Sequence, residues 1–305
     1  MRVLLTGATG YVGSYVLRAL AAHDHTVRAL TRSASDDLVD TDADVERVVG
    51  DVTAPATLRP ALDGCDAVIH LVGIIEEHPS RGVTFERIHV DGTQNVVDAA
   101  RDAGIDRFAH MSANGARPAH GTAYQTTKWR AEQIVQQAGF AHWTIFRPAL
   151  LFGRPDPGRP EFASQLLRDL IRPFPVWPVF GDGRYTMQPV HVTEVAAAFA
   201  QALEREHAHA ATYVAAGPTR LAYVDLLDVI ARGAGLPPQS KVHVPLLIAR
   251  LGVYTAGRIG LLPISPAQFE MLIEGNTGDA SAFYDDFDLD PTPFAPDTLA
   301  YLRDA

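Results

Sequence analysis

The chain has 305 residues, of which 47% are hydrophobic and 20% are charged, as in an ordinary globular protein. Its formal net charge of −10 argues against nucleic acid as a partner, because phosphate backbones require a basic surface. The single cysteine, Cys65, excludes an intrachain disulfide and favours a reducing, cytoplasmic location.

Short apolar runs alternate with helix-like segments from the first residue onward. Strands are expected at residues 2–6, 26–30, 45–49, 67–71, 107–111, 143–147 and 212–215, and helices at 11–22, 58–62, 84–103, 123–138, 193–206 and 223–233. This alternation is typical of βαβ crossovers, which build a parallel sheet with helices on both faces. We therefore predict an α/β fold with a Rossmann-type, doubly wound parallel sheet.

The composition changes after Gly153, where residues 154–160 become rich in proline and glycine. We predict a Rossmann domain over residues 1–153, to which residues 186–215 return. A smaller C-terminal region, made of residues 154–185 and 216–305, would cover the substrate. Its acidic, proline-bearing tail at 285–296 is expected to lie over the surface.

Three glycines, Gly7, Gly10 and Gly13, separate the first predicted strand from the first predicted helix. Gly7 permits a tight turn, Gly10 lets the backbone approach a diphosphate, and Gly13 lets the helix pack close to the strand. The helix N-terminus offers free N–H groups to phosphates. The turn therefore predicts a dinucleotide site, whose other candidates here are Thr9, Tyr11 and Val12.

The end of the second predicted strand bears on the choice of cofactor. NAD-binding proteins usually place Asp or Glu there to bind the ribose 2′-hydroxyl. Here the strand is followed by Arg32 and Ser33, and the acids Asp36 and Asp37 come later. A guanidinium binds a phosphate through charge-assisted hydrogen bonds. The sequence therefore favours NADP(H), with NAD(H) as the alternative.

Tyr124 and Lys128 are four residues apart in a predicted helix and share one face. Hydride transfer to or from an alcohol carbon requires a proton transfer at the oxygen, and a free tyrosine titrates at about pH 10. A nearby ammonium favours the phenolate and lowers the pKa of the tyrosine. The pair therefore predicts acid–base catalysis, with Lys128 also reaching the ribose hydroxyls; the alternative is a chance pair on the surface.

At these residues the sequence resembles the short-chain dehydrogenase/reductase superfamily, in its extended and atypical branches. The resemblance covers nearly the whole chain, through Thr6–Gly13, Gly50–Val52, His70–Gly73, Asp91–Asn95, Tyr124 with Lys128, Arg147–Pro148, Phe152–Gly153 and Gly181–Val192. It implies that Asp51 lies by the adenine. It also implies that the cofactor is bound by Val52, Leu71, Val72, Gly73 and Pro148.

More narrowly, the chain resembles the group related to the NADPH-binding accessory subunit of respiratory complex I. The features are Ser112–Ala116 and a late segment from Leu262 to Asn276. The resemblance implies an NADPH-dependent oxidoreductase acting on a carbonyl, quinone-like or lipid-like substrate. The alternatives are a nucleotide-sugar epimerase or dehydratase and an NADPH-binding structural or assembly protein of a respiratory complex.

Two positions depart from the superfamily pattern. Active extended members usually carry serine or threonine at a later position of the loop that Ser112 begins, whereas this chain has Ala113 and Asn114 after Ser112. Ser112 and Asn114 are therefore the candidates for polarising the substrate oxygen. His89 stands where many relatives have asparagine. Both changes bear on catalysis and leave the cofactor site intact.

An apolar stretch at residues 242–264 contains Arg250, Arg258, Pro245 and Pro263, which argues against a membrane-spanning helix. It predicts internal packing, or else peripheral contact with the inner face of a membrane or with a protein complex. The twelve histidines show no ligand spacing that would predict a metal site.

Overall fold

The computed structural model describes residues 1–38, 45–159, 161–255 and 264–304 and divides the chain into two units. The first unit consists of Met1–Pro148, Val192–Ala215 and Ala280–Asp290. The second consists of Ala149–His191, Ala216–Asp279 and Pro291–Ala305. The division therefore falls at Pro148 and Val192, whereas the sequence places it at 153 and 186.

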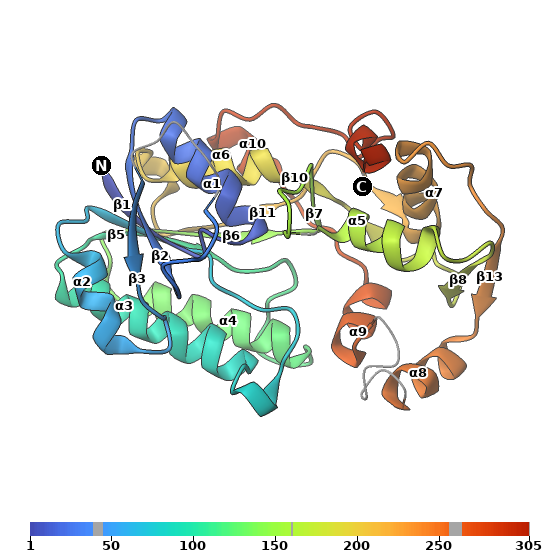
Figure 1. The fold of residues 1–305 in the computed structure, drawn as a ribbon, viewed down its shortest axis with the longest axis horizontal. Helices are drawn as coiled ribbons and strands as arrows, with labels where there is room; N and C mark the ends of the chain where they lie inside the picture. The colour runs from blue at the N-terminus through green and yellow to red at the C-terminus, as the bar shows by residue number, and fades with distance from the viewer. Residues whose placement is uncertain (39–44, 160, 256–263, 305) are drawn as a thin grey trace. The chain divides into compact units, whose positions relative to one another are not determined.

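A seven-stranded parallel sheet with the order β11-β6-β5-β4-β1-β2-β3 forms the centre of the first unit (Figure 1). Its strands are β1 (Arg2–Thr6), β2 (Thr26–Thr31), β3 (Val45–Val49), β4 (Ala67–His70), β5 (Arg107–Met111), β6 (His142–Pro148) and β11 (Ala211–Ala215). The strand order turns back between β1 and β4, and ligands of open parallel sheets bind beyond the carboxyl ends of the strands at such a point.

Helices cover both faces of this sheet, which confirms the predicted doubly wound fold (Figure 1). One face carries α1 (Tyr11–Ala22), α6 (Val192–Ala202) and α10 (Ser281–Asp286); the other carries α2 (Leu58–Leu62), α3 (Gly92–Asp102) and α4 (Ala123–Gln137). Each helix buries one apolar stripe: Val96 and Val97 of α3, for example, join Val68 and Phe108 of the sheet in one core. Burial of a side chain of this size contributes about 1.5–3 kcal/mol.

Two predicted helices differ in the structure. The helix expected at 84–103 opens with a π-helical segment, Glu86–Asp91, before α3 begins at Gly92. The helix expected at 193–206 ends at Ala202, because the chain then turns and Arg205 bonds the backbone carbonyl of Asp286.

The acidic tail was expected to lie over the surface, but the structure buries its aromatic side chains. Phe287 is buried, with its ring centroid 5.5 Å from that of Phe146 in β6. Phe294 is buried in the core of the second unit. The apolar side chains therefore decide where this segment lies, whereas its acidic residues suggested exposure.

The second unit consists of short strand pairs and helices. The strands are β7 (Leu151–Phe152) with β10 (Val190–His191), β9 (Thr186–Met187) with β12 (Leu221–Ala222), and β8 (Trp177–Phe180) with β13 (Lys241–Val244). The helices are α5 (Phe162–Leu166), α7 (Tyr223–Gly233), α8 (Leu246–Thr255) and α9 (Pro266–Glu274). Residues 256–263 of the apolar stretch lie outside the described residues. No helix in the described ranges is long and apolar enough to cross a membrane.

Candidate functional site

The turn between β1 and α1 has the geometry that its glycines predict. Gly7 has a φ of +79°, in the left-handed region. A Cβ on Gly13 would lie 2.0 Å from the carbonyl oxygen of Gly7, so only glycine fits there. Gly10 occupies the N-cap position of α1, and no side chain caps the helix. The positive end of α1 is therefore available to an anion.

A cleft of about 430 Å³ lies beside this turn. The expected cofactor-binding residues that line it are Gly7, Thr9, Gly10, Arg32, Asp51, Val52, Leu71, Val72 and Gly73. Those that do not line it are Tyr11, Val12, Gly13, Ser33, Tyr124, Lys128 and Pro148. The hydroxyl of Ser33 lies 2.9 Å from that of Ser35, and the role of Gly13 is the close packing of α1.

The sequence motifs missed part of the lining. The additional residues are Leu30, Thr31, Gly50, Thr53, Ile74, Arg81, Gly82, Val83, Arg87 and Ile88. The first five are sequence neighbours of expected residues at the ends of β2, β3 and β4. The predicted positions of these strand ends could have identified them. The others belong to residues 81–88, between β4 and α3, which carry none of the predicted motifs.

The chemistry of the cleft fits a dinucleotide. Thr31 is 2% exposed, and its hydroxyl has no hydrogen-bond partner among the described residues. The Asp51 carboxylate accepts hydrogen bonds from the N–H and hydroxyl of Thr53, at 2.8 and 2.9 Å, which fixes it at the end of β3. A Cβ on Gly73 would lie 3.0 Å from the Lys128 Nζ, so this glycine keeps space beside the ammonium. A hydroxyl or phosphate group of a bound cofactor would give the buried Thr31 hydroxyl a hydrogen-bond partner.

Helix α4 presents Tyr124 and Lys128 on one side. A capping box between Thr122 and Gln125 fixes the start of the helix just before the tyrosine. The Tyr124 ring packs edge-on against those of His89 and Phe85, at centroid distances of 5.5 and 5.7 Å. The position of the phenol is therefore set by contacts from the segment that precedes α3.

The protonation of this pair differs from the expectation. Lys128 is buried, and its Nζ donates to the carbonyl oxygen of Met111 at 2.8 Å. Burial lowers the pKa of Lys128 to about 8, although the charge of Glu132 opposes this. Burial raises the pKa of Tyr124 to about 12, whereas the sequence predicted a pKa lowered by Lys128. Tyr124 is therefore a protonated phenol at neutral pH and carries the proton that a donor needs, while the raised pKa makes it a weaker acid than a free tyrosine.

Ser112 is bound into an internal network. Its hydroxyl donates to Glu132, a fully buried carboxylate that also accepts from the Arg147 Nε and Nη2, at 2.8 and 2.6 Å. A serine has one hydrogen to donate, so Ser112 would have to leave Glu132 before polarising a substrate oxygen. Asn114 is half-buried, and its main-chain N–H donates to the carbonyl of Pro148 at 2.9 Å.

His89 connects α4 to the cleft. Its Nδ1 lies 3.0 Å from the Thr127 hydroxyl, and its Nε2 accepts from the Ile74 N–H at 3.0 Å. The Thr127 hydroxyl gives its hydrogen to the Ala123 carbonyl at 2.8 Å, so it accepts from His89 Nδ1–H. Burial, and then the charge of Lys128, lower the pKa of His89 to about 3, which keeps the ring neutral. His89 therefore holds the loop after β4 against the face of α4 that carries Tyr124 and Lys128.

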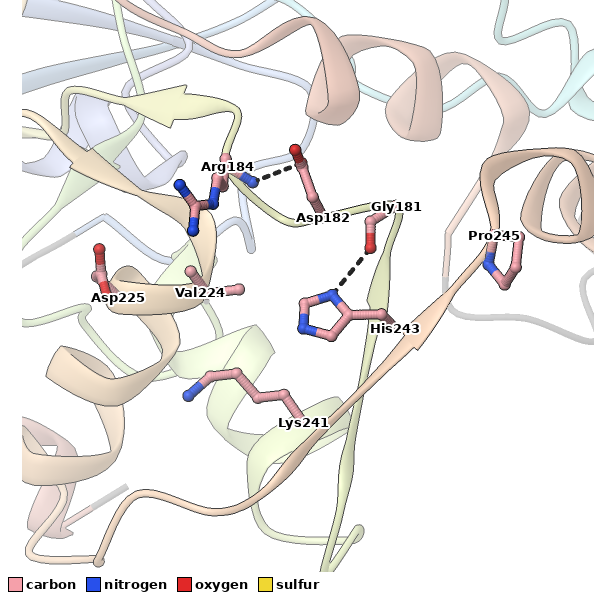
Figure 2. A pocket seen from close by; sticks show the side chains of 8 residues that line it. All are labelled: Gly181, Asp182, Arg184, Val224, Asp225, Lys241, His243 and Pro245. Carbon is pink, nitrogen blue, oxygen red and sulfur yellow. Dashed lines mark hydrogen bonds between the residues drawn. The ribbon is translucent and has the colours of Figure 1, made fainter.

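A separate pocket of about 710 Å³ lies in the second unit (Figure 2). Two of its polar side chains are engaged: the His243 Nδ1 lies 2.9 Å from the Gly181 carbonyl oxygen, and Lys241 pairs with Asp228 at 2.6 Å. None of the expected site residues line this pocket. Among the described residues, no group of His, Cys, Asp and Glu could hold a metal ion.

The parallel sheet, the glycine turn and the cleft at the switch in strand order define a dinucleotide-binding α/β protein of the Rossmann type. Comparison with known proteins narrows this class. The model of the NAD dependent epimerase/dehydratase family matches residues 3–216, and the chain belongs to that family. The predicted resemblance to the extended short-chain dehydrogenases is confirmed.

Individual relatives are more varied. The chain is 32% identical to the 4-hydroxy-2-methyl-3-oxo-4-farnesyl-3,4-dihydroquinoline-1-oxide ketoreductase of Stigmatella aurantiaca, over 88% of this chain and 78% of that protein. It is 26% identical to the mitochondrial NADH-ubiquinone oxidoreductase 40 kDa subunit of Neurospora crassa, over 97% of this chain and 77% of that protein. The predicted resemblance to complex I subunits is thereby confirmed.

A solved structure shows the same fold. The UDP-glucuronic acid 4-epimerase from Bacillus cereus in complex with NAD superposes with a TM-score of 0.75 over all of this chain and 96% of that one. At 17% identity this likeness concerns the fold alone. The chain thus has the NAD(P)-binding fold of its family.

Proposed function

We propose that the protein is an oxidoreductase that uses NADPH to reduce a carbonyl group on a quinone-like or lipid-like substrate. The observation that carries this proposal is the placement of Tyr124 and Lys128 one turn apart on α4, a helix that His89 ties to the loop lining the dinucleotide cleft. A protonated phenol suits reduction, because the step needs a proton donor at the carbonyl oxygen.

A nicotinamide cofactor held by the glycine turn and the cleft would supply a hydride to the carbonyl carbon. Tyr124 gives its phenolic proton to the carbonyl oxygen, so that the C=O double bond becomes an alcohol. Lys128, mostly protonated at neutral pH because its pKa is about 8, stabilises the phenolate that remains. Solvent then returns a proton to Tyr124.

The preference for NADPH rests on the end of β2. Arg32 lines the cleft there, and the strand closes on Thr31 where an acid would favour NAD. Within the described part of the chain, the Arg32 guanidinium makes no ion pair with a carboxylate. An uncommitted guanidinium at this position supports binding of a 2′-phosphate.

The substrate class rests on one relative. The relative from Stigmatella aurantiaca is named as a ketoreductase of a farnesylated dihydroquinoline oxide, a compound with a ring ketone and an isoprenoid tail. This name supports a quinone-like or lipid-like ketone as the substrate.

The test is NADPH oxidation by the purified protein with farnesylated quinones, isoprenoid ketones and nucleotide sugars. Tyr124→Phe should lower kcat by roughly 100-fold or more, because the proton donor is lost. The variant should still be stabilised by NADPH in a thermal melt. Tyr254→Phe, at an exposed tyrosine of α8, serves as the control. Absence of turnover across the panel, or full activity of Tyr124→Phe, would contradict the proposal.

A second candidate is an NADPH-binding structural subunit at a membrane or in a respiratory complex. The favouring observation is α8, whose side chains Leu247, Ile248 and Leu251 are 81%, 61% and 69% exposed. Such a face suits the headgroup region of a bilayer or a partner protein. Co-sedimentation of the protein with lipid vesicles, abolished in Leu247→Glu/Leu251→Glu, would support this candidate. A protein that does not bind vesicles and oxidises NADPH efficiently with a substrate of the panel would exclude it.

A further inference from the structure

Two arginines outside the cofactor motifs line the cleft. Arg81 and Arg87 come from the segment between β4 and α3, and both are exposed. With Arg32 they place three guanidinium groups around a cleft whose lining contains one carboxylate, Asp51. In a chain of net charge −10, this is a local reversal of sign that favours an anionic ligand.

The turn that carries these arginines is fixed by its own backbone. The His78 N–H donates to the Val83 carbonyl at 2.7 Å, and the Val83 N–H donates back at 3.2 Å. Gly82 has a φ of +68°, and a Cβ there would lie 2.6 Å from the Arg87 Nη1. The same nitrogen donates to the Gly82 carbonyl at 3.2 Å. The glycine thus lets the Arg87 guanidinium lie against the turn at the cleft.

Two acidic groups near these arginines in sequence are engaged elsewhere. Glu77 accepts the Phe85 N–H at 2.7 Å, and Glu86 pairs with Arg130 at 2.5 Å. Among the residues that the structure describes, neither Arg81 nor Arg87 has a carboxylate partner. Their charge is therefore available to phosphate oxygens, which a guanidinium binds through two parallel hydrogen bonds.

The position of Arg87 points to the adenosine half of the site. A Cβ on Gly92 would lie 3.1 Å from Val52 and 3.6 Å from the carbonyl oxygen of Arg87. The backbone of Arg87 therefore lies beside the end of β3, where Asp51 is expected near the adenine. Arg32 lies at the end of the adjacent strand, β2.

We propose that Arg81 and Arg87 form an outer wall of the cofactor site and bind phosphate groups of the dinucleotide. This inference rests on the proposed use of NADPH and adds two determinants of affinity to it. Because both side chains are exposed, their contribution is electrostatic and weakens as salt rises.

The experiment is a calorimetric titration of NADPH and NADH into the wild-type protein, Arg81→Gln/Arg87→Gln and Arg59→Gln. Arg59 is an exposed arginine of α2 that does not line the cleft, so its variant controls for the loss of a positive charge away from the cleft. The double variant should bind NADPH roughly tenfold more weakly at low salt, with a shallower salt dependence, whereas Arg59→Gln should bind as the wild type does. Thermal melts without ligand should coincide.

The two cofactors distinguish the phosphates. If the double variant binds only NADPH more weakly, the arginines contact the 2′-phosphate. If it binds NADPH and NADH more weakly by the same factor, they contact the diphosphate. If the double variant binds both cofactors as Arg59→Gln does, the inference is overturned while the proposed function stands. If the wild-type protein binds neither cofactor, both fail together.

Discussion

The glycine turn after β1 and the face of α4 that carries Tyr124 and Lys128 are held in place by different means. The turn depends on backbone contacts within a few residues, such as the close approach of Gly13 to Gly7. The face of α4 depends on side chains from distant segments: Ser112 and Arg147 bond Glu132, and His89 bonds Thr127. A steric demand acts at one position, whereas loss of one member of a network leaves the others unsatisfied.

The largest effect is therefore expected in the network. Glu132→Ala removes a fully buried carboxylate and leaves Arg147 without its partner, which should lower the free energy of unfolding by about 3 kcal/mol. Urea denaturation measures this. Glu132→Gln keeps oxygen and nitrogen atoms in place and should cost less. Equal, small losses in both variants would show that the network does not stabilise this face.

Glu132→Gln also tests how the charge of Glu132 acts on Lys128. The charge of Glu132 raises the pKa of Lys128, so its removal should move the deprotonation of Lys128 to a pH below about 8. The basic limb of the pH–rate profile should shift in the same direction. An unmoved limb would mean that Lys128 does not control it.

In the turn, Gly13→Ala should cost about 2–3 kcal/mol, because the new Cβ would overlap the Gly7 carbonyl and force backbone to move. NADPH should also lose its stabilising effect in thermal melts. Gly252→Ala is the matched control: a Cβ in the middle of α8 meets nothing within 4 Å and should be neutral or slightly stabilising. Similar melting temperatures for the two variants would contradict the steric argument.

The same contrast explains what the sequence could predict. Strand and helix bounds such as β1, α1 and β5 follow from local periodicity, and the roles of Gly7 and Gly13 follow from backbone sterics. The partner of Ser112 is a residue twenty positions away, on another element, and no local pattern predicts it. Arg81 and Arg87 were missed for the same reason, since the turn that brings them to the cleft has no motif.

At the end of β2, Arg32→Ser should reduce the preference for NADPH over NADH by roughly tenfold, because a charge-assisted contact to the 2′-phosphate is lost. Affinity for NADH should change little. The ratio of the two dissociation constants measures the effect. If NADPH and NADH both bound more weakly by the same factor, Arg32 would instead contact the diphosphate.

The smallest effect is expected at His110 of β5, which lies in the sheet rather than at the cleft. Its ring stacks on His70 at 5.4 Å, and neither ring nitrogen has a hydrogen-bond partner among the described residues. Burial, and then the charge of Lys128, lower the pKa of His110 well below its usual value. The unfolded chain therefore binds a proton below about pH 6.5 that the folded chain does not, and stability falls as the pH falls through that value.

His110→Phe removes this titration without breaking a hydrogen bond, so at pH 8 its free energy of unfolding should lie within about 1 kcal/mol of the wild-type value. Between about pH 6.5 and 5 the variant should lose less stability than the wild type. His70, which lies 2.7 Å from the Thr6 hydroxyl, would still titrate and leave part of the acid sensitivity. Parallel pH profiles of the two proteins in urea denaturation would show that His110 is not one of the groups that drive acid unfolding.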